Sequence, residues 1–172
     1  VCTFFTSLEL RVFSQGEPQE PGFLNVVDLI ALQTPTYFNI QDFKLNDGTP
    51  SIPGYDSGFI SFNPGEYDLT VTNEGARPDQ ETITFKIESG KNTIVICYDE
   101  TEYDDEGEPR SKLRCNLLVE SLKEDLPRIS VVSLLQPDQI LGKVGVRQVM
   151  FQKRKALRLP AKLNESVIIR VG

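Results

Sequence analysis

The chain has no histidine and no tryptophan, and only three of its 172 residues are cysteine. Without histidine, neither a Ser-His-Asp triad nor a Cys-His pair can form, and most zinc and non-haem iron sites lose their commonest ligand. Without tryptophan, a sugar-stacking platform loses its best residue. These absences predict a binding or scaffolding protein that uses no cofactor.

Long apolar runs are also lacking. The longest candidates, residues 23–32 and 93–97, are too short or too polar to supply the ~18 apolar residues that a bilayer crossing needs. No transmembrane segment is therefore expected. The formal net charge of −7 argues against nucleic acid as the main partner.

The cysteines, Cys2, Cys97 and Cys115, are too few for a disulfide scaffold and lack the spacing of a metal site. Three interpretations stay open: buried small hydrophobes, a bridge between Cys97 and Cys115 near the ends of one predicted hairpin, or a reactive nucleophile. The third lacks a histidine to activate it.

Period-two alternation of apolar and polar residues dominates the chain and predicts an all-β protein. Strands are expected over 6–13, 37–40, 43–45, 58–62, 66–73, 82–88, 93–98, 129–134, 143–151 and 166–171. A tight turn is expected at Asn46-Asp47-Gly48. Residues 112–120 are predicted as a returning strand, and a helix over 116–126 is the alternative because leucine recurs there every four residues. The predicted core contains Tyr67, Leu69, Val71, Ile83, Phe85, Ile87, Ile94 and Ile96.

Many short strands separated by Gly and Pro turns are typical of a sandwich or barrel. We expect an antiparallel β-sandwich of immunoglobulin or transthyretin type. Residues 1–126 would form this module, and residues 127–172 would form a partial second β repeat that packs on the first or continues it.

One stretch of the chain carries a family resemblance. It runs Phe62-Asn-Pro-Gly-Glu-Tyr-Asp-Leu-Thr-Val-Thr-Asn-Glu-Gly75 and continues over Thr82–Val95 with a Ser-Gly-Lys turn. This pattern resembles bacterial cell-envelope β-sandwich modules, namely transthyretin-like (carboxypeptidase-regulatory-like) domains and a repeated secreted family of unknown function.

In the unknown-function family each repeat tends to open with a Leu-Arg-Val-type strand. Leu10-Arg-Val-Phe-Ser14 fits that opening, and Arg128-Ile-Ser-Val-Val-Ser133 resembles a second one. The resemblance implies one full sandwich followed by part of a second, located outside the cytoplasm in the periplasm, on the cell surface or secreted. Residues 99–109 are longer and more acidic than the pattern, and the second unit is too short to close a sandwich alone. The family has no agreed activity, so no functional residues carry over.

Seven carboxylates fall within residues 99–108. We expect them at the exposed tip of a hairpin between Asp99 and Arg110, because like charges cannot be buried unpaired without a large cost. A calcium site is an alternative, but Leu113 stands where the closing Glu of a calcium loop belongs. Paired catalytic carboxylates are a weaker alternative, since a hairpin tip offers no cleft.

Opposite charge gathers at the other end of the sequence. Residues 143–172 contain eight basic residues and one acidic residue, whereas residues 1–142 contain ten and twenty-four. The predicted interaction surface is Arg147, Lys153, Arg154, Lys155 and Arg158. A bulge is expected near Arg147 and Gln148, and the strand should end near Gln152. The partner would be an anionic envelope polysaccharide or the acidic face of another copy; the alternative is a solvated face neutralised within the molecule.

The leading hypothesis is therefore a non-enzymatic structural or binding module of the bacterial cell envelope or exterior. The alternative is a carbohydrate-active or other hydrolase with paired carboxylates, drawn from Asp28, Asp42, Asp47 and Asp56. Each of these four residues is equally compatible with ordinary turn chemistry.

Overall fold

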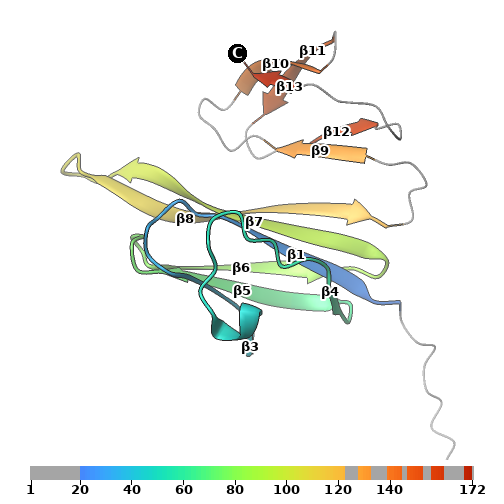
Figure 1. Ribbon diagram of the computed structural model, residues 1–172, viewed down its shortest axis with the longest axis horizontal. Helices are drawn as coiled ribbons and strands as arrows, with labels where there is room; N and C mark the ends of the chain where they lie inside the picture. Colours follow the sequence, from blue (N-terminus) through green and yellow to red (C-terminus); the bar gives the residue numbers. More distant parts are fainter. Residues whose placement is uncertain are drawn as a thin grey trace, which may run out of the picture.

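The computed structural model describes residues 20–122 with their side chains, and the backbone of five later strands within 128–171. Residues 20–122 form two four-stranded sheets that face one another (Figure 1). The first sheet has the order β4-β1-β7-β8, and the second has the order β3-β2-β5-β6. The strands are β1 (Gly22–Leu29), β2 (Thr36–Ile40), β3 (Phe43–Lys44), β4 (Ile60–Phe62), β5 (Gly65–Asn73), β6 (Gln80–Ile87), β7 (Lys91–Tyr103) and β8 (Pro109–Ser121).

Alternating side chains from both sheets fill the space between them. Leu24 and Val26 on β1 meet Leu69 and Val71 on β5 in one apolar cluster, and all four are fully buried. Inward and outward side chains alternate along both strands and so close the sandwich, although the sequence pattern predicts only β5 as a strand. The all-β sandwich expected from the sequence is confirmed.

Two of the predicted core residues lie on the wrong side of their strand. Val95 and Cys97 of β7 are fully buried in the core, whereas Ile94 and Ile96 have the opposite parity and are only partly buried on the outer face. The run Ile94-Val-Ile-Cys97 is apolar at every position, so alternation alone does not specify which face is inward. Of the other six predicted core residues, Leu69, Val71, Phe85 and Ile87 are buried, and Tyr67 and Ile83 are partly buried against the core.

The first sheet is not wholly antiparallel. β1 pairs with β7 in parallel over seven positions, from Phe23 opposite Asn92 to Leu29 opposite Tyr98. The other strand pairs that the structure describes are antiparallel. Most of the apolar run at 23–32 thus lies in β1, an interior strand of the first sheet. The described residues contain no helix with the length and apolarity that a membrane crossing requires.

The structure decides between strand and helix at residues 112–126. β8 is a strand from Pro109 to Ser121 that pairs with β7 along its whole length, so the helical alternative over 116–126 is wrong for the described residues. The turn at Asn46-Asp47-Gly48 forms as predicted, within a short 3-10 segment η1 (Leu45–Gly48). Asn46 and Asp47 have φ of +52° there, which suits Asn and Asp.

Five further strands follow: β9 (Arg128–Val132), β10 (Gln139–Val144), β11 (Arg147–Gln152), β12 (Ala156–Pro160) and β13 (Ile169–Val171). They pair only with one another among the described strands, as β12-β9 and β11-β10-β13. The single strand predicted over 143–151 with a bulge is wrong. β10 ends at Val144 and β11 returns antiparallel from Arg147, which also explains the change of apolar parity there. β11 does end at Gln152.

Core burial predicts a sharp difference between two leucines. Replacing the fully buried Leu69 by Ala should lower the free energy of unfolding by about 2–5 kcal/mol, because it removes packed methyl groups and leaves a cavity. Leu117→Ala is the matched control, since the Leu117 side chain is 41% exposed and should cost less than about 1 kcal/mol. Urea unfolding followed by circular dichroism measures both, and equal losses would contradict the assigned core.

Candidate functional site

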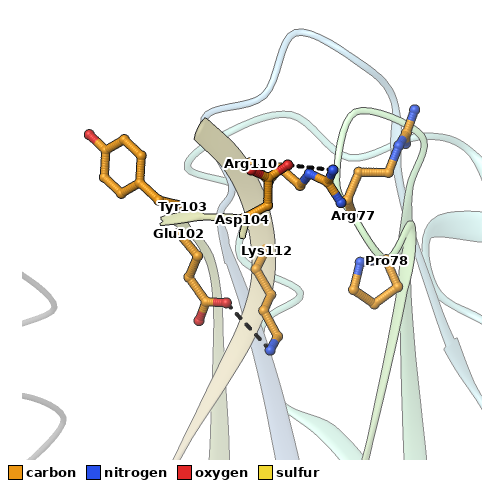
Figure 2. Close-up of a pocket in the computed structure, with 7 residues that line it drawn as sticks. All are labelled: Arg77, Pro78, Glu102, Tyr103, Asp104, Arg110 and Lys112. Atoms are coloured by element: carbon orange, nitrogen blue, oxygen red, sulfur yellow. Dashed lines mark ion pairs between the residues drawn. The ribbon is translucent and has the colours of Figure 1, made fainter. Parts of the chain in front are cut away.

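An open polar cavity of about 200 Å³ lies where the β5–β6 loop meets the β7–β8 hairpin. Figure 2 shows the residues that line it, with Tyr103 pointing away from the charged groups. The lining consists of Arg77, Pro78, Glu102, Tyr103, Asp104, Arg110 and Lys112.

The loop side of the cavity is anchored through its backbone. The amide of Arg77 donates to the carbonyl of Ser111 at 2.7 Å, which ties the loop to β8. The Arg77 guanidinium donates to the carbonyls of Glu74 and Ala76 at 2.8 and 2.7 Å. No ion pair joins Arg77 to a carboxylate among the described residues, and its side chain points away from the other charged groups that line the cavity (Figure 2).

The hairpin side is a ladder of ion pairs on one face of the β7–β8 ribbon. Arg114 contacts Glu100 at 3.3 Å and also pairs with Glu102, while Lys112 lies 3.6 Å from Glu102. Arg110 pairs with Asp104 (Figure 2). Three of the seven carboxylates of the acidic run thus pair with cations of β8. The tip itself is only residues 104–108, shorter than the expected 99–110.

Asp104 organises that tip. Its carboxylate accepts the amides of Glu108 and Glu106 at 2.8 and 3.0 Å. The amide of Glu108, the amide of Glu106 and the nearby Arg110 together hold the pKa of Asp104 below its usual value. The sequence contained a signal for this ladder, because acidic residues at 100 and 102 face basic residues at 110–114 once the chain folds back near Gly107. The acidic run considered alone does not reveal the ladder.

A second cluster is buried inside the sandwich around Asp28. The Asp28 carboxylate accepts the hydroxyl of Ser51 and, at 2.9 Å, the amide of Ile30. It is fully buried, and burial raises its pKa although both hydrogen bonds act in the opposite direction. The neighbouring Asp99 adds to the rise, and its own carboxylate accepts the amide of Ala31 at 2.6 Å. These bonds fasten the loop after β1 to β7 and to the β3–β4 connection.

The four carboxylates of the hydrolase alternative do not form a site together. Asp28 is inaccessible, and Asp56 accepts the amide of Gly58 at 2.7 Å in a local turn. Asp42 and Asp47 are exposed, in the β2–β3 turn and in η1. Within the described part of the chain, no three Cys, Asp or Glu side chains gather closely enough to hold a metal ion, so the acidic hairpin has no assembled calcium ligand set.

Cys97 and Cys115 lie directly opposite one another on β7 and β8. Their Sγ atoms are 3.4 Å apart and both thiols are free. The hydrogen bond between the thiols and the burial of Cys97 raise the pKa of the Cys97 thiol. A raised pKa disfavours the thiolate, so a reactive nucleophile is disfavoured while a bridge remains a prediction. Cys2 lies outside the described residues.

The predicted basic surface is only partly described. Arg147 begins β11 and Arg158 lies on β12, and these strands belong to different sheets. Lys153, Arg154 and Lys155 lie outside the described residues. The surface therefore stays a prediction. The chain matches no known protein-family model and no curated protein.

The buried carboxyl predicts a specific pH dependence. Because the pKa of Asp28 is raised in the folded state, its contribution to stability is present in acid and is lost as pH rises through the folded pKa. Asp28→Asn mimics the protonated form and should not show this loss. Between about pH 4 and neutrality, the free energy of unfolding of the unaltered protein should therefore fall relative to that of the variant, by at most about 1.4 kcal/mol per pH unit. Parallel stability-pH curves would refute the assignment. Asp56→Asn, at an exposed turn, is the matched control and should leave the curve unchanged.

The facing thiols predict a bridge under oxidation. Two thiols would pass two electrons and two protons to oxidised glutathione, and the resulting Cys97–Cys115 bond would raise the free energy of unfolding by about 3 kcal/mol for a loop of this length. Cys2→Ser removes the third thiol, and peptide mass spectrometry then maps the bond. The same variant with Cys115→Ser should gain no stability with oxidant. A bridge that lowers stability would contradict the inferred geometry.

Proposed function

We propose that the chain is a non-enzymatic structural or binding module of the bacterial cell envelope or exterior. The observation that supports this most is the opposite charge of its two parts. Residues 20–122 contain seven basic and nineteen acidic residues, whereas residues 128–171 contain nine and two. One chain thus carries both members of a complementary electrostatic pair.

The acidic excess is not cancelled within the first part. Lys91, Arg110, Lys112 and Arg114, four of its seven cations, pair with carboxylates of the same sandwich. Most of the remaining carboxylates are on exposed turns and outward-facing strand positions, where a partner molecule can reach them. The charge difference is available for long-range attraction between molecules.

Three of the carboxylates have structural roles that do not involve catalysis. Asp28 and Asp104 fix loops through backbone amides, and Asp56 closes a turn. A hydrolase that uses paired carboxylates needs two carboxyl groups with separated pKa values facing one cleft. The cavity beside the hairpin contains Glu102 and Asp104, both of which are ion-paired.

The partner that fits the basic part is an anionic envelope polysaccharide or the acidic face of another copy, as the sequence predicts. Either attraction acts between exposed charges and is screened over a Debye length of about 8 Å at physiological ionic strength. The two partners differ in one respect: self-association takes place with the protein alone, and polysaccharide binding requires the added polymer.

Charge reversal tests the proposal. At low salt, the triple variant Lys153→Glu, Arg154→Glu, Lys155→Glu should bind an anionic polysaccharide, or associate with itself, with an affinity lower by about tenfold or more. Lys44→Glu with Lys86→Glu is the control, since both residues are exposed on the second sheet of the sandwich, outside the basic segment. Sedimentation and titration at low and high salt measure the two effects. Unchanged behaviour of the triple variant would mean that this basic segment is a solvated face.

A further inference from the structure

Three chemically active side chains lie in one row across the first sheet. Asp28 on β1 is opposite Cys97 on β7, and Cys97 is opposite Cys115 on β8. All three lie on the inner face of the sheet. Asp28 and Cys97 are fully buried, and Cys115 packs against the core while it remains partly exposed. Neighbouring strands are about 4.8 Å apart, so each of these side chains has the next one beside it.

The row places the two thiols in different surroundings. Cys97 has no exposed surface, whereas Cys115 has some. Leu117 follows Cys115 on the same face of β8 and is 41% exposed, so this part of the inner face is open to solvent. A dissolved disulfide can therefore reach Cys115 and cannot reach Cys97.

The buried thiol cannot pass its proton directly to water. The hydrogen bond between the thiols and burial raise the pKa of Cys97, and the charge of Asp28 adds to the rise. Cys97 therefore stays protonated at neutral pH. Because the thiolate is the reactive form of cysteine, Cys97 can act as a nucleophile only when a neighbouring group takes its proton. The chain has no histidine for this purpose.

Asp28 has the chemistry of a proton acceptor. Its carboxylate accepts the amide of Ile30 and the hydroxyl of Ser51, and a carboxylate has about four acceptor positions. Of the described titratable groups, Asp99 and Cys97 face Asp28 from β7. Burial raises the pKa of Asp28, and the charge of Asp99 adds to the rise. A raised pKa makes the carboxylate a stronger base and brings it closer to the pKa of a thiol.

We propose that Cys115, Cys97 and Asp28 form a thiol–disulfide exchange site for a small disulfide such as oxidised glutathione. The Cys115 thiolate attacks the external disulfide, whose S–S bond breaks to give a mixed disulfide on Cys115 and one free thiolate. Cys97 then attacks the Cys115 sulfur while its proton passes to the Asp28 carboxylate, and the second external thiolate leaves. Two electrons have then passed from the two cysteines to the external disulfide. One proton has gone from Cys115 to solvent, and one has gone from Cys97 to Asp28.

The same groups act in the opposite direction. An external thiolate attacks the Cys115 sulfur of the internal bond, and Cys97 leaves as a thiolate that takes a proton from the protonated Asp28. The site is independent of the charge difference that supports the proposed function, so either proposal can fail alone.

An aromatic disulfide, dithiobis-nitrobenzoate, separates the two steps because each step releases one coloured thiolate. In the full chain with Cys2→Ser, stopped-flow mixing should show a first release as Cys115 is modified and a second release as Cys97 closes the bond. Mass spectrometry should then find the internal bridge and no adduct. When Cys97→Ser is added, only the first release should remain, and its adduct should map to Cys115.

Asp28→Asn tests the proton transfer. At neutral pH it should slow the second release by about 100-fold and leave the first within about twofold. In the protein with Asp28, the second release should quicken as pH rises through the raised pKa of Asp28 and then level off. In the variant it should quicken about tenfold per pH unit through neutrality, because the thiolate then forms by loss of the proton to solvent. Asp56→Asn, at an exposed turn, is the matched control and should leave both rates unchanged.

Circular dichroism identifies a variant that loses its fold, and in such a variant both releases become fast because both thiols are exposed. The pH profile of the protein with Asp28 intact is then the deciding measurement. A second release that keeps quickening about tenfold per pH unit through neutrality in that protein would overturn the proposal. Equal slowing of both releases by Asp28→Asn, an unchanged second release, or an adduct that maps first to Cys97 would also overturn it.

Discussion

The parallel pairing of β1 with β7 is the constraint on which the sandwich depends. These strands are the two interior strands of the first sheet, and they contribute four fully buried residues to the core: Leu24, Val26, Val95 and Cys97. More than sixty residues separate them in the sequence, so their pairing closes a long loop that contains β2–β6 and the whole β3–β4 connection. Bonds to Asp28 and Asp99 then fasten the loops at one end of this pair. A non-local contact of this kind makes folding slow relative to a meander of hairpins.

The inward face of a strand could be predicted from the sequence where the other face is polar, and could not where both faces are apolar. Apolar and polar residues alternate along β5 and β6 because the outer faces of these strands are polar. β2 is indicated by the turn signal at Asn46-Asp47-Gly48. β1 was not recognised as a strand, because its apolar residues are nearly continuous and its partner is parallel and distant. The same continuity at Ile94-Val-Ile-Cys97 is why the predicted core contains Ile94 and Ile96 in place of Val95 and Cys97. Period-two reasoning fails where a strand is shielded on both faces.

At the candidate site, too, some features could be predicted from the sequence and others could not. The acidic hairpin was expected from composition, but the ladder that neutralises it depends on register, which places Glu102 opposite Arg110 and Glu100 opposite Lys112. Arg77 reaches the cavity from a loop whose path no local pattern specifies. Asp28 was singled out as a carboxylate of interest, yet its burial and its bond to Ser51 come from tertiary packing. Residue types were therefore predictable, and their partners were not.

The two ends of the first sandwich lie side by side. The amide of Gly90 donates to the carbonyl of Pro21 at 3.1 Å, and the amide of Leu122 donates to the carbonyl of Gly90 at 3.2 Å, so the chain enters and leaves at one end of the sheet. A tensile force applied through both ends would peel β8 from β7 and β1 from its neighbours one hydrogen bond at a time. Strands that are pulled in shear, from opposite ends, must break many bonds at once. A sandwich whose two ends lie together in this way should therefore unfold at a lower pulling force than one loaded in shear.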